Sequence, residues 1–182
     1  MIIVTPSCRP ENLHVVRESI PFDTIPDLRW IIVYDAPCEK QFGDDPRIEE
    51  HVHVAAGVAG HPQRNYALDL LTEVDDYVYF LDDDNLLHPD FTSVPCRSGE
   101  RTIYTFDQDL GSRGGVRVGN NVRVDAIDTA MFIVPLELCR DIRWNPHKYN
   151  ADGYFIKECV DAYPASWKYI SRKLCYYNKL RS

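Results

Sequence analysis

The feature that most constrains the fold of this chain is a series of short apolar runs, each ended abruptly by proline or acidic residues. Residues 2–5 (IIVT) stop at Pro6, Arg29–Tyr34 (RWIIVY) stop at Asp35, and residues 77–81 (YVYFL) stop at three aspartates. Short apolar runs rich in β-branched and aromatic residues are typical of buried strands. We therefore predict that these runs form strands inside a sheet.

Segments with helical spacing separate the runs. Residues 10–20 and 62–71 each place apolar side chains on one helical face, and residues 48–54 form a further candidate strand between them. Strands that alternate with helices indicate an α/β fold with a parallel sheet. We expect a Rossmann-like α/β fold in which helices flank a mostly parallel central sheet.

The second half of the chain is less regular. Residues 101–106, 131–134 and 169–177 are candidate strands, residues 151–161 a candidate helix, and residues 111–121 a Gly-rich loop or hairpin. The full length of 182 residues suits one domain better than two. We expect this half to complete the same sheet, so that residues 1–182 form a single domain.

The charge of the chain excludes one class of partner. The 20 Lys and Arg residues are outnumbered by 28 Asp and Glu residues, which gives a net charge of −8. A chain with this charge has no general positive field to bind nucleic acid.

The sequence also shows no leader pattern, no run long enough to span a membrane and no CxxC pair among its six cysteines. We expect a cytoplasmic protein with reduced thiols.

Three adjacent aspartates, Asp82-Asp83-Asp84, follow the most strand-like run, and no lysine or arginine occurs from Asn65 to Cys96. Like charges held close together raise one another's pKa unless a cation intervenes. Mg²⁺ and Mn²⁺ prefer oxygen ligands and are often bound by one or two carboxylates together with substrate phosphates. The sequence therefore favours a divalent-cation site here over a solvated acidic turn.

Several other ligand motifs are absent from the sequence. Leu87 stands where a calcium loop of the EF-hand type beginning at Asp82 needs glycine, and no phosphate-binding GxxxxGK[ST] motif occurs. The segment GSRGGVRVG at residues 111–119 is predicted to be a flexible loop. Its two arginines, Arg113 and Arg117, also allow a weaker interpretation as a mobile cover for an anionic ligand.

The order of the motifs resembles a known group of enzymes. The segments TP, LRWIIVYDA, PQRNYAL and YFLDDDN follow one another through residues 2–91, and VDAIDTAMFIV follows at 124–134. This order is similar to that of nucleotide-sugar glycosyltransferases of the GT-A fold, and most similar to the inverting glucuronyltransferases. The pieces are short, so their common order carries the resemblance.

The resemblance implies a donor site at the ends of the first strands. Thr5, Pro6 and Asp35 would line a uridine pocket, with Asp35 accepting a hydrogen bond from the uracil imide. Arg64 would contact the base or the diphosphate, although an ordinary arginine on a helix face would look the same in the sequence.

The resemblance also assigns roles to the acidic residues. Asp84 would coordinate Mn²⁺ or Mg²⁺, and Asp82 would support the loop and act as the second metal ligand. Asp82 and Asp83 would also contact the nucleotide sugar, with Asp83 reaching the ribose or sharing the metal. Asp128 would lie near the donor or acceptor sugar, unless it only caps a strand.

An inverting transfer needs a base that accepts the proton of the acceptor hydroxyl. The family has a glutamate at the start of a late helix, and the matching residue here is Asp152, with Glu158 as the second choice. A helix-capping aspartate is the structural alternative for Asp152. The family also has a later histidine near the diphosphate, which this chain lacks. Candidate replacements are Arg172, Lys173, Tyr176, Tyr177 and Asn178.

The sequence therefore predicts a metal-dependent glycosyltransferase that moves a sugar from a nucleoside diphosphate, with UDP favoured, to a hydroxyl of a glycan or other acceptor. Residues 1–91 would bind the donor and residues 92–182 the acceptor.

The sequence leaves three alternatives to this prediction. A phosphotransferase of the haloacid-dehalogenase type would use Asp82 and Asp84, but this chain has Leu86 where that family has threonine or valine. A sugar-phosphate nucleotidyltransferase would begin with a Gly-rich segment, which this chain lacks. A non-catalytic module that binds a nucleotide sugar is the third alternative.

Overall fold

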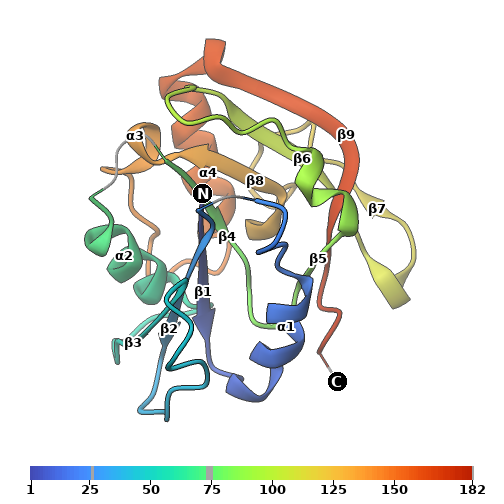
Figure 1. Cartoon of the computed structure of the whole chain (residues 1–182). Helices are drawn as coiled ribbons and strands as arrows, with labels where there is room; N and C mark the ends of the chain where they lie inside the picture. The colour runs from blue at the N-terminus through green and yellow to red at the C-terminus, as the bar shows by residue number, and fades with distance from the viewer. Residues whose placement is uncertain (26, 73–75, 182) are drawn as a thin grey trace.

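The runs predicted to be strands lie side by side and parallel in the computed structural model, which describes residues 1–25, 27–72 and 76–181. The strands of this half are β1 (Ile2–Ser7), β2 (Arg29–Tyr34), β3 (Ile48–Val52) and β4 (Tyr77–Phe80). The predicted strands are confirmed, with bounds shifted by at most two residues. Figure 1 shows β1, β2 and β3 in the lower part of the molecule and β4 near its centre.

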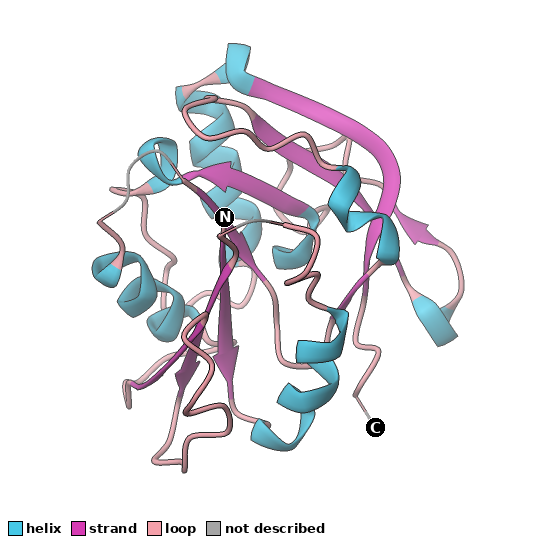
Figure 2. Cartoon of the chain, viewed as in Figure 1, coloured by secondary structure: helices cyan, strands magenta, loops and turns pink. Residues whose placement is uncertain are grey.

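Two helices complete this half of the fold (Figure 2). A 3₁₀ turn at Pro10–Asn12 leads into α1 (Leu13–Ser19), so the predicted helix begins as a tighter turn. Helix α2 (His61–Leu70) has proline in its first turn, where the missing N–H is not needed. The two helices contribute to different apolar clusters and therefore cover opposite faces of the sheet.

The second half of the chain extends the same sheet, as predicted. Its elements are β5 (Leu86–Leu87), β6 (Ile103–Asp109), β7 (Val116–Arg117), β8 (Phe132–Pro135), α3 (Leu136–Cys139), α4 (Ala151–Ala162) and β9 (Trp167–Tyr176). Within the described residues the strand order is β3-β2-β1-β4-β8-β6-β9-β5, and β7 pairs with β6. Strand β8 lies antiparallel to both β4 and β6, so the parallel pairing from β3 to β4 gives way to mixed pairing. The Gly-rich segment forms the β6–β7 hairpin.

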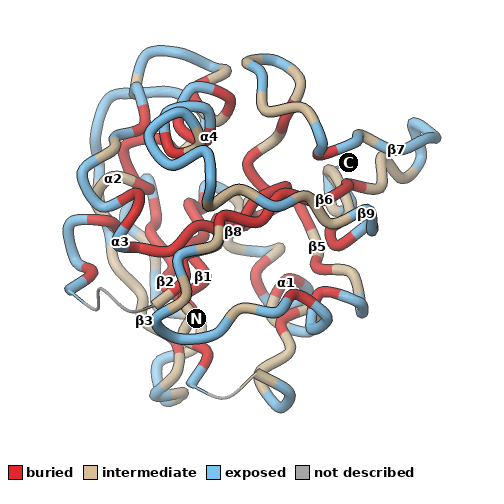
Figure 3. The backbone as a smooth tube through the Cα atoms, turned by 90° about the horizontal axis from the view of Figure 1, so that it is seen from above, coloured by how far each residue is buried: buried red, intermediate tan, exposed pale blue. Residues whose placement is uncertain are grey.

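The core is built from side chains that alternate between the two faces of the sheet. Ile2 and Val4 of β1 pack on the face covered by α2, α3 and α4, whereas Ile3 packs on the face covered by α1. In the view from above (Figure 3), buried residues follow β1, β2 and β8, and exposed residues lie mainly in the surrounding loops. The domain therefore has one central sheet with an apolar layer on each side.

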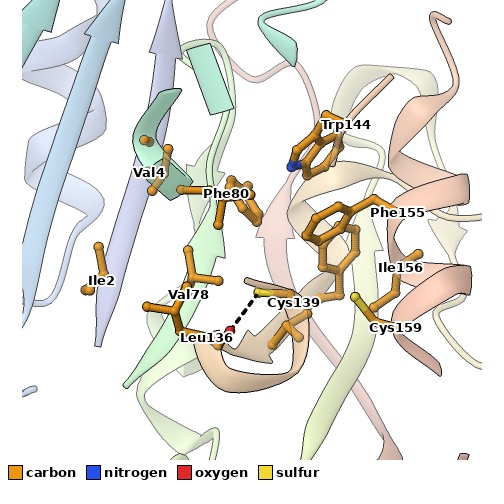
Figure 4. Packing of buried hydrophobic residues seen from close by; sticks show 14 of the residues in the cluster. Ile2, Val4, Val78, Phe80, Leu136, Cys139, Trp144, Phe155, Ile156 and Cys159 are labelled. Atoms are coloured by element: carbon orange, nitrogen blue, oxygen red, sulfur yellow. Dashed lines mark hydrogen bonds between the residues drawn. The ribbon is translucent and has the colours of Figure 1, made fainter. Parts of the chain in front are cut away.

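An aromatic group connects helix α4 to strand β4. The ring of Trp144 lies 5.0 Å from that of Phe80 and 4.5 Å from that of Phe155, measured between centroids (Figure 4). All three side chains are fully or almost fully buried. Because Phe80 ends β4 and Phe155 lies in the second turn of α4, this packing fixes the start of α4 relative to the aspartates that follow β4.

All six cysteines lie in the described part of the chain and are free thiols, as expected. No helix among residues 1–25, 27–72 and 76–181 combines the length and the apolar character that a membrane span requires.

Candidate functional site

A cleft of about 320 Å³ opens at the edge of the sheet where β1, β2 and β4 end. Pro6, Asp35 and the three aspartates Asp82, Asp83 and Asp84 lie on its walls. Open α/β sheets bind their ligands at the carboxyl ends of the strands. The structure thus brings together predicted site residues from three separate strand ends.

Asp83 joins the end of β4 to the end of β1. Its Oδ2 atom accepts hydrogen bonds from the hydroxyl of Ser7 (3.2 Å) and from the backbone N–H groups of Cys8 (2.9 Å) and Arg9 (2.8 Å). Its Oδ1 atom accepts from Nε of Arg9 at 2.9 Å. Both oxygens of this carboxylate, which is 2% exposed, are therefore engaged within the protein. Any contact of Asp83 with a ribose or a metal would compete with these bonds.

Replacing Asp83 with asparagine is expected to destabilise the fold by about 2–4 kcal/mol, because charge-assisted bonds are lost and buried donors lose their acceptor. Urea unfolding of the two proteins measures this difference. Asp44 is exposed, so Asp44→Asn serves as the matched control and should change stability by less than about 0.5 kcal/mol. Equal stability of Asp83→Asn and the wild type would show that Asp83 does not hold the strand ends together.

Arg64 is 1% exposed and is not among the residues that line this cleft, but it lines a smaller cavity beside it. Its Nη2 atom donates to Oδ1 of Asp82, its Nη1 atom lies 2.9 Å from Nδ1 of His61, and its guanidinium carbon lies 4.7 Å from the ring centroid of Trp144. Burial and the charge of Arg64 lower the pKa of His61 to about 4, so this ring is neutral near pH 7 and accepts from Arg64 at Nδ1. Arg64 is therefore a buried arginine engaged by neighbouring side chains, and its predicted contact with the base or the diphosphate stays a prediction.

Burial raises the pKa of two cleft carboxyls. The pKa of Asp82 rises to about 7 because burial and the nearby charge of Asp128 outweigh the ion pair with Arg64. Burial likewise raises the pKa of Asp84, against the opposing charge of Arg9, whose Nη2 atom lies 3.0 Å from Asp84. The ion pairs with Arg64 and Arg9 therefore do not fully offset the cost of holding Asp82 and Asp84 in their charged forms.

Asp82 and Asp84 both line the cleft, and carboxylate oxygens are the ligands that a hard divalent cation prefers. Within residues 1–25, 27–72 and 76–181, no three His, Cys, Asp or Glu side chains gather into a complete protein metal site. Mg²⁺ and Mn²⁺ are usually bound by one or two carboxylates and take their other ligands from water and substrate phosphates. A pair of carboxylates with raised pKa values on an open cleft fits this kind of site.

Of the three residues predicted to line the uridine pocket, Pro6 and Asp35 line the other wall of the cleft, and Thr5 does not line the cleft. Asp35 is exposed there, whereas Thr5 lies beneath the wall, fully buried, with its Oγ1 accepting from Nε1 of Trp30 at 2.8 Å. Gly60 precedes α2 with a φ of +72°, and a Cβ at this position would lie 2.5 Å from Cβ of Pro6. Glycine at position 60 therefore lets the loop before α2 approach β1 and close this wall.

A second cavity of about 190 Å³ adjoins the cleft and shares Asp82 and Asp128 with it. Asp152 lines this cavity as the second residue of α4, where Asn150 occupies the N-cap position. The Asp152 carboxylate accepts from the N–H of Gly153 at 2.7 Å, and burial and the charge of Asp128 raise its pKa to about 6. Asp152 is therefore not the N-cap residue, although it accepts from an N–H in the first turn of α4, and it lines the cavity.

Asp128 lines both cavities and has a structural role as well, whereas its predicted contact with a sugar stays a prediction. Its carboxylate caps the 3₁₀ turn Thr129–Met131 by accepting from the N–H of Ala130 at 3.3 Å. It also accepts from Gln108 (3.0 Å) and pairs with Arg117 (3.1 Å). These bonds hold one carboxylate at the boundary where the two cavities meet.

The segment after β9 supplies residues that the sequence predicted only in part. Tyr177 and Asn178, two of the candidate replacements for the missing histidine, line the cleft together with Arg181, which sequence reasoning missed. The backbone N–H of Asn178 donates to the side chain of Asn85 (2.7 Å), which places this segment beside the aspartates. The available signal was a basic residue following the last predicted strand.

Comparisons with known proteins show similarity in fold only. No protein-family model matches the chain, and no curated protein sequence matches it either. The crystal structure of TarS residues 1–349 from S. aureus has a TM-score of 0.66 and 12% identity, covering 96% of this chain and 59% of that one. Our chain therefore spans less than two thirds of TarS.

Two further structures match with similarly low sequence identity. Glucosyl-3-phosphoglycerate synthase from Mycobacterium tuberculosis, crystallised with Mn²⁺, UDP and phosphoglyceric acid, has a TM-score of 0.63 and 13% identity over 96% of this chain and 69% of that one. HddC from Yersinia pseudotuberculosis has a TM-score of 0.55 and 12% identity over 95% of this chain and 91% of that one. The chain thus has the curled α/β fold of the GT-A glycosyltransferases, as the sequence predicted.

Proposed function

We propose that the protein is a divalent-cation-dependent glycosyltransferase that transfers a sugar from a UDP donor to an acceptor hydroxyl with inversion. The proposal is carried by the convergence of Asp35, Asp82 and Asp84 on one cleft at the carboxyl edge of a GT-A sheet. The synthase with the same fold that was crystallised with Mn²⁺ and UDP supports it. The motif order that resembles the inverting glucuronyltransferases supports inversion.

The donor would lie along the main cleft. Asp35, exposed on the wall beside Pro6, accepts the imide N–H of uracil, and Thr5 supports this wall from below. Arg181 and Asn178, which line the same cleft beside the aspartates, supply donors for the diphosphate. This arrangement gives the place of the missing histidine to the segment after β9.

The middle of the cleft would hold the cation and the reacting sugar. Asp84 and Asp82 would hold Mn²⁺ or Mg²⁺, which when bound supplies positive charge that offsets the charge developing on the leaving diphosphate. Arg64 fixes the orientation of Asp82 from below through their ion pair. Asp83, fully hydrogen-bonded, keeps the ends of β1 and β4 together beneath the nucleotide sugar.

The acceptor would enter the second cavity, next to Asp152. Its hydroxyl oxygen forms a bond to the anomeric carbon as the bond from that carbon to the diphosphate breaks, and its proton passes to the Asp152 carboxylate. Asp128, at the boundary between the cavities, contacts the sugar being transferred. Residues 1–91 thus supply most of the donor site, and residues 92–182 the acceptor site and the segment that closes the donor cleft.

The phosphotransferase alternative gains no support from this geometry. Its nucleophile would be Asp82, whose carboxylate is bound to the buried guanidinium of Arg64. A non-catalytic binding module would keep the same cleft, so only turnover distinguishes it from an enzyme.

The proposal is tested by incubating the protein with Mn²⁺ and a panel of nucleotide sugars together with a panel of glycan and other hydroxyl acceptors. We expect one UDP-sugar to give acceptor-dependent release of UDP and a product with inverted anomeric configuration. Stabilisation by UDP-sugars without any release of UDP would favour the binding module. A retained configuration would contradict the role of Asp152, and a lack of any stabilisation would contradict the proposed function.

A further inference from the structure

A polar pocket of about 280 Å³, called here the side pocket, opens beside the proposed donor cleft. It is lined by Leu110, Ser112, Arg113, Tyr177, Asn178 and Arg181. The last three residues also line the donor cleft, whereas the first three line neither of the other two cavities. The side pocket therefore continues the donor cleft toward the β6–β7 hairpin, which lies on the same side of the molecule as the end of the chain (Figures 1 and 3).

The side pocket is cationic although the chain carries a net charge of −8. Arg113 and Arg181 supply two guanidinium groups, and no aspartate or glutamate is among the lining residues. Asp109, which ends β6, forms an ion pair with Lys173 at 2.8 Å. Within the part of the chain that the structure describes, no carboxylate pairs with Arg113 or Arg181. Arg113 is thus available to an anion in the side pocket, whereas Arg181 also lines the donor cleft, where its charge acts on Asp84.

Tyr177 holds the hairpin arginine at the pocket. Two guanidinium groups lie close to its ring, with the Arg113 carbon 5.0 Å and the Arg117 carbon 5.1 Å from the ring centroid. Such cation–π contacts favour a fixed arrangement of the charged groups over the ring. Arg117 is already paired with Asp128, so Arg113 is the member of this pair that remains open to a ligand.

We infer that the side pocket binds an anionic group, phosphate or carboxylate, carried by the acceptor; this inference rests on the proposed function of the neighbouring cleft. The planar fork of a guanidinium matches the oxygens of phosphate and carboxylate groups. The hydroxyl of Ser112 and the amide of Asn178 add neutral donors. The donor diphosphate belongs to the cleft beside Asp84, and the three residues unique to the side pocket line space beyond it.

The test uses glycerol 3-phosphate as the phosphate probe, glycerate as the carboxylate probe and glycerol as the neutral control. Each is titrated into isotopically labelled protein of residues 1–182 with UDP and Mg²⁺ present, and binding is followed by nuclear magnetic resonance. We expect at least one anionic probe to bind and glycerol not to bind. Arg113→Ala should weaken the anionic probe at least about tenfold, since a hydrogen bond to a charged group is lost. Arg97→Ala removes an exposed arginine that lines none of the three cavities and should leave probe binding unchanged.

The outcomes separate this inference from the proposed function. Equal binding of glycerol and the anionic probes, or no effect of Arg113→Ala, would overturn the inference while UDP binding stays intact. Displacement of UDP by glycerol 3-phosphate would also overturn it, because the pocket would then belong to the donor diphosphate. Failure of UDP to bind the wild type, with probe binding still dependent on Arg113, would contradict the proposed function and leave an anion site.

Discussion

Replacing Asp152 with asparagine is expected to lower the rate of sugar transfer by about 100- to 10,000-fold, the usual contribution of a positioned general base. Asparagine keeps the size of the side chain and its hydrogen-bonding carbonyl, so the contact with the N–H of Gly153 can persist. UDP binds in the neighbouring cleft, and its affinity should therefore change by less than about twofold, within the range of surface substitutions. Steady-state rates of UDP release and calorimetric titration with UDP measure the two effects.

Glu158 provides the matched control for this experiment. It lies in the same helix but is exposed and lines none of the three cavities, so Glu158→Gln should retain the wild-type rate. If Glu158→Gln lost activity and Asp152→Asn kept it, the assignment of the base would be wrong. Loss of UDP binding in Asp152→Asn would instead mean that Asp152 belongs to the donor site.

The pH dependence of the wild-type rate follows from the environment of Asp152. A base accepts a proton only in its ionised form, and burial together with Asp128 raises the pKa of this carboxyl to about 6. Below that pH the value of kcat/KM should fall about tenfold per pH unit, and above it the rate should level off. A profile with no inflection between about pH 5 and about pH 7 would argue against a base with this pKa.

Asp84→Asn is the second substitution with a large expected effect, and it should act on donor binding. Loss of a residue that lies behind a metal ligand costs about 10- to 100-fold in metal affinity, so loss of a ligand should cost at least about 100-fold in Mn²⁺-dependent UDP binding. The substitution keeps the shape of the side chain and removes its charge. Calorimetric titration of UDP into each protein with Mn²⁺ measures the change, and transfer activity should fall with it.

Asp90 supplies the control for Asp84. Its side chain is exposed and lies outside the cleft, in the 3₁₀ turn Pro89–Ser93, so Asp90→Asn removes the same charge from the same acidic segment. UDP affinity in this variant should remain within about twofold of the wild type. Equal loss in both variants would mean that the general field of the segment, and not a metal contact at Asp84, controls binding.

The strands and the cleft could be predicted from the sequence because they depend on local patterns. An apolar run that stops at Pro6, Asp35 or Asp82 both forms a strand and marks its end. In a parallel sheet, such ends meet at one edge without further information. The helices could be predicted for the same reason, because the spacing of their apolar residues is also a local pattern. The start of α1 differs, since it begins as a 3₁₀ turn.

Features that depend on contacts between residues far apart in the sequence cannot be predicted from such local patterns. The sequence could not decide whether Arg64 is exposed, since its burial requires Trp144 and Asp82 from other parts of the fold. Asp83 looked like a ligand, but its bonds to β1 become visible only when the two strand ends are adjacent. Arg181 reaches the cleft because its segment crosses the loop after β4, where Leu180 donates to the carbonyl of Asp84 at 3.0 Å. No local pattern contains these pairings.

The central claim is that this cleft binds a uridine diphosphate group together with a divalent cation. The most direct measurement is a calorimetric titration of UDP into the wild-type protein, once with Mn²⁺ and once with a chelator. We expect saturable binding with Mn²⁺ at one site per chain and an affinity at least about tenfold lower with the chelator. No binding of UDP in the presence of Mn²⁺, or the same affinity with and without the cation, would contradict the account.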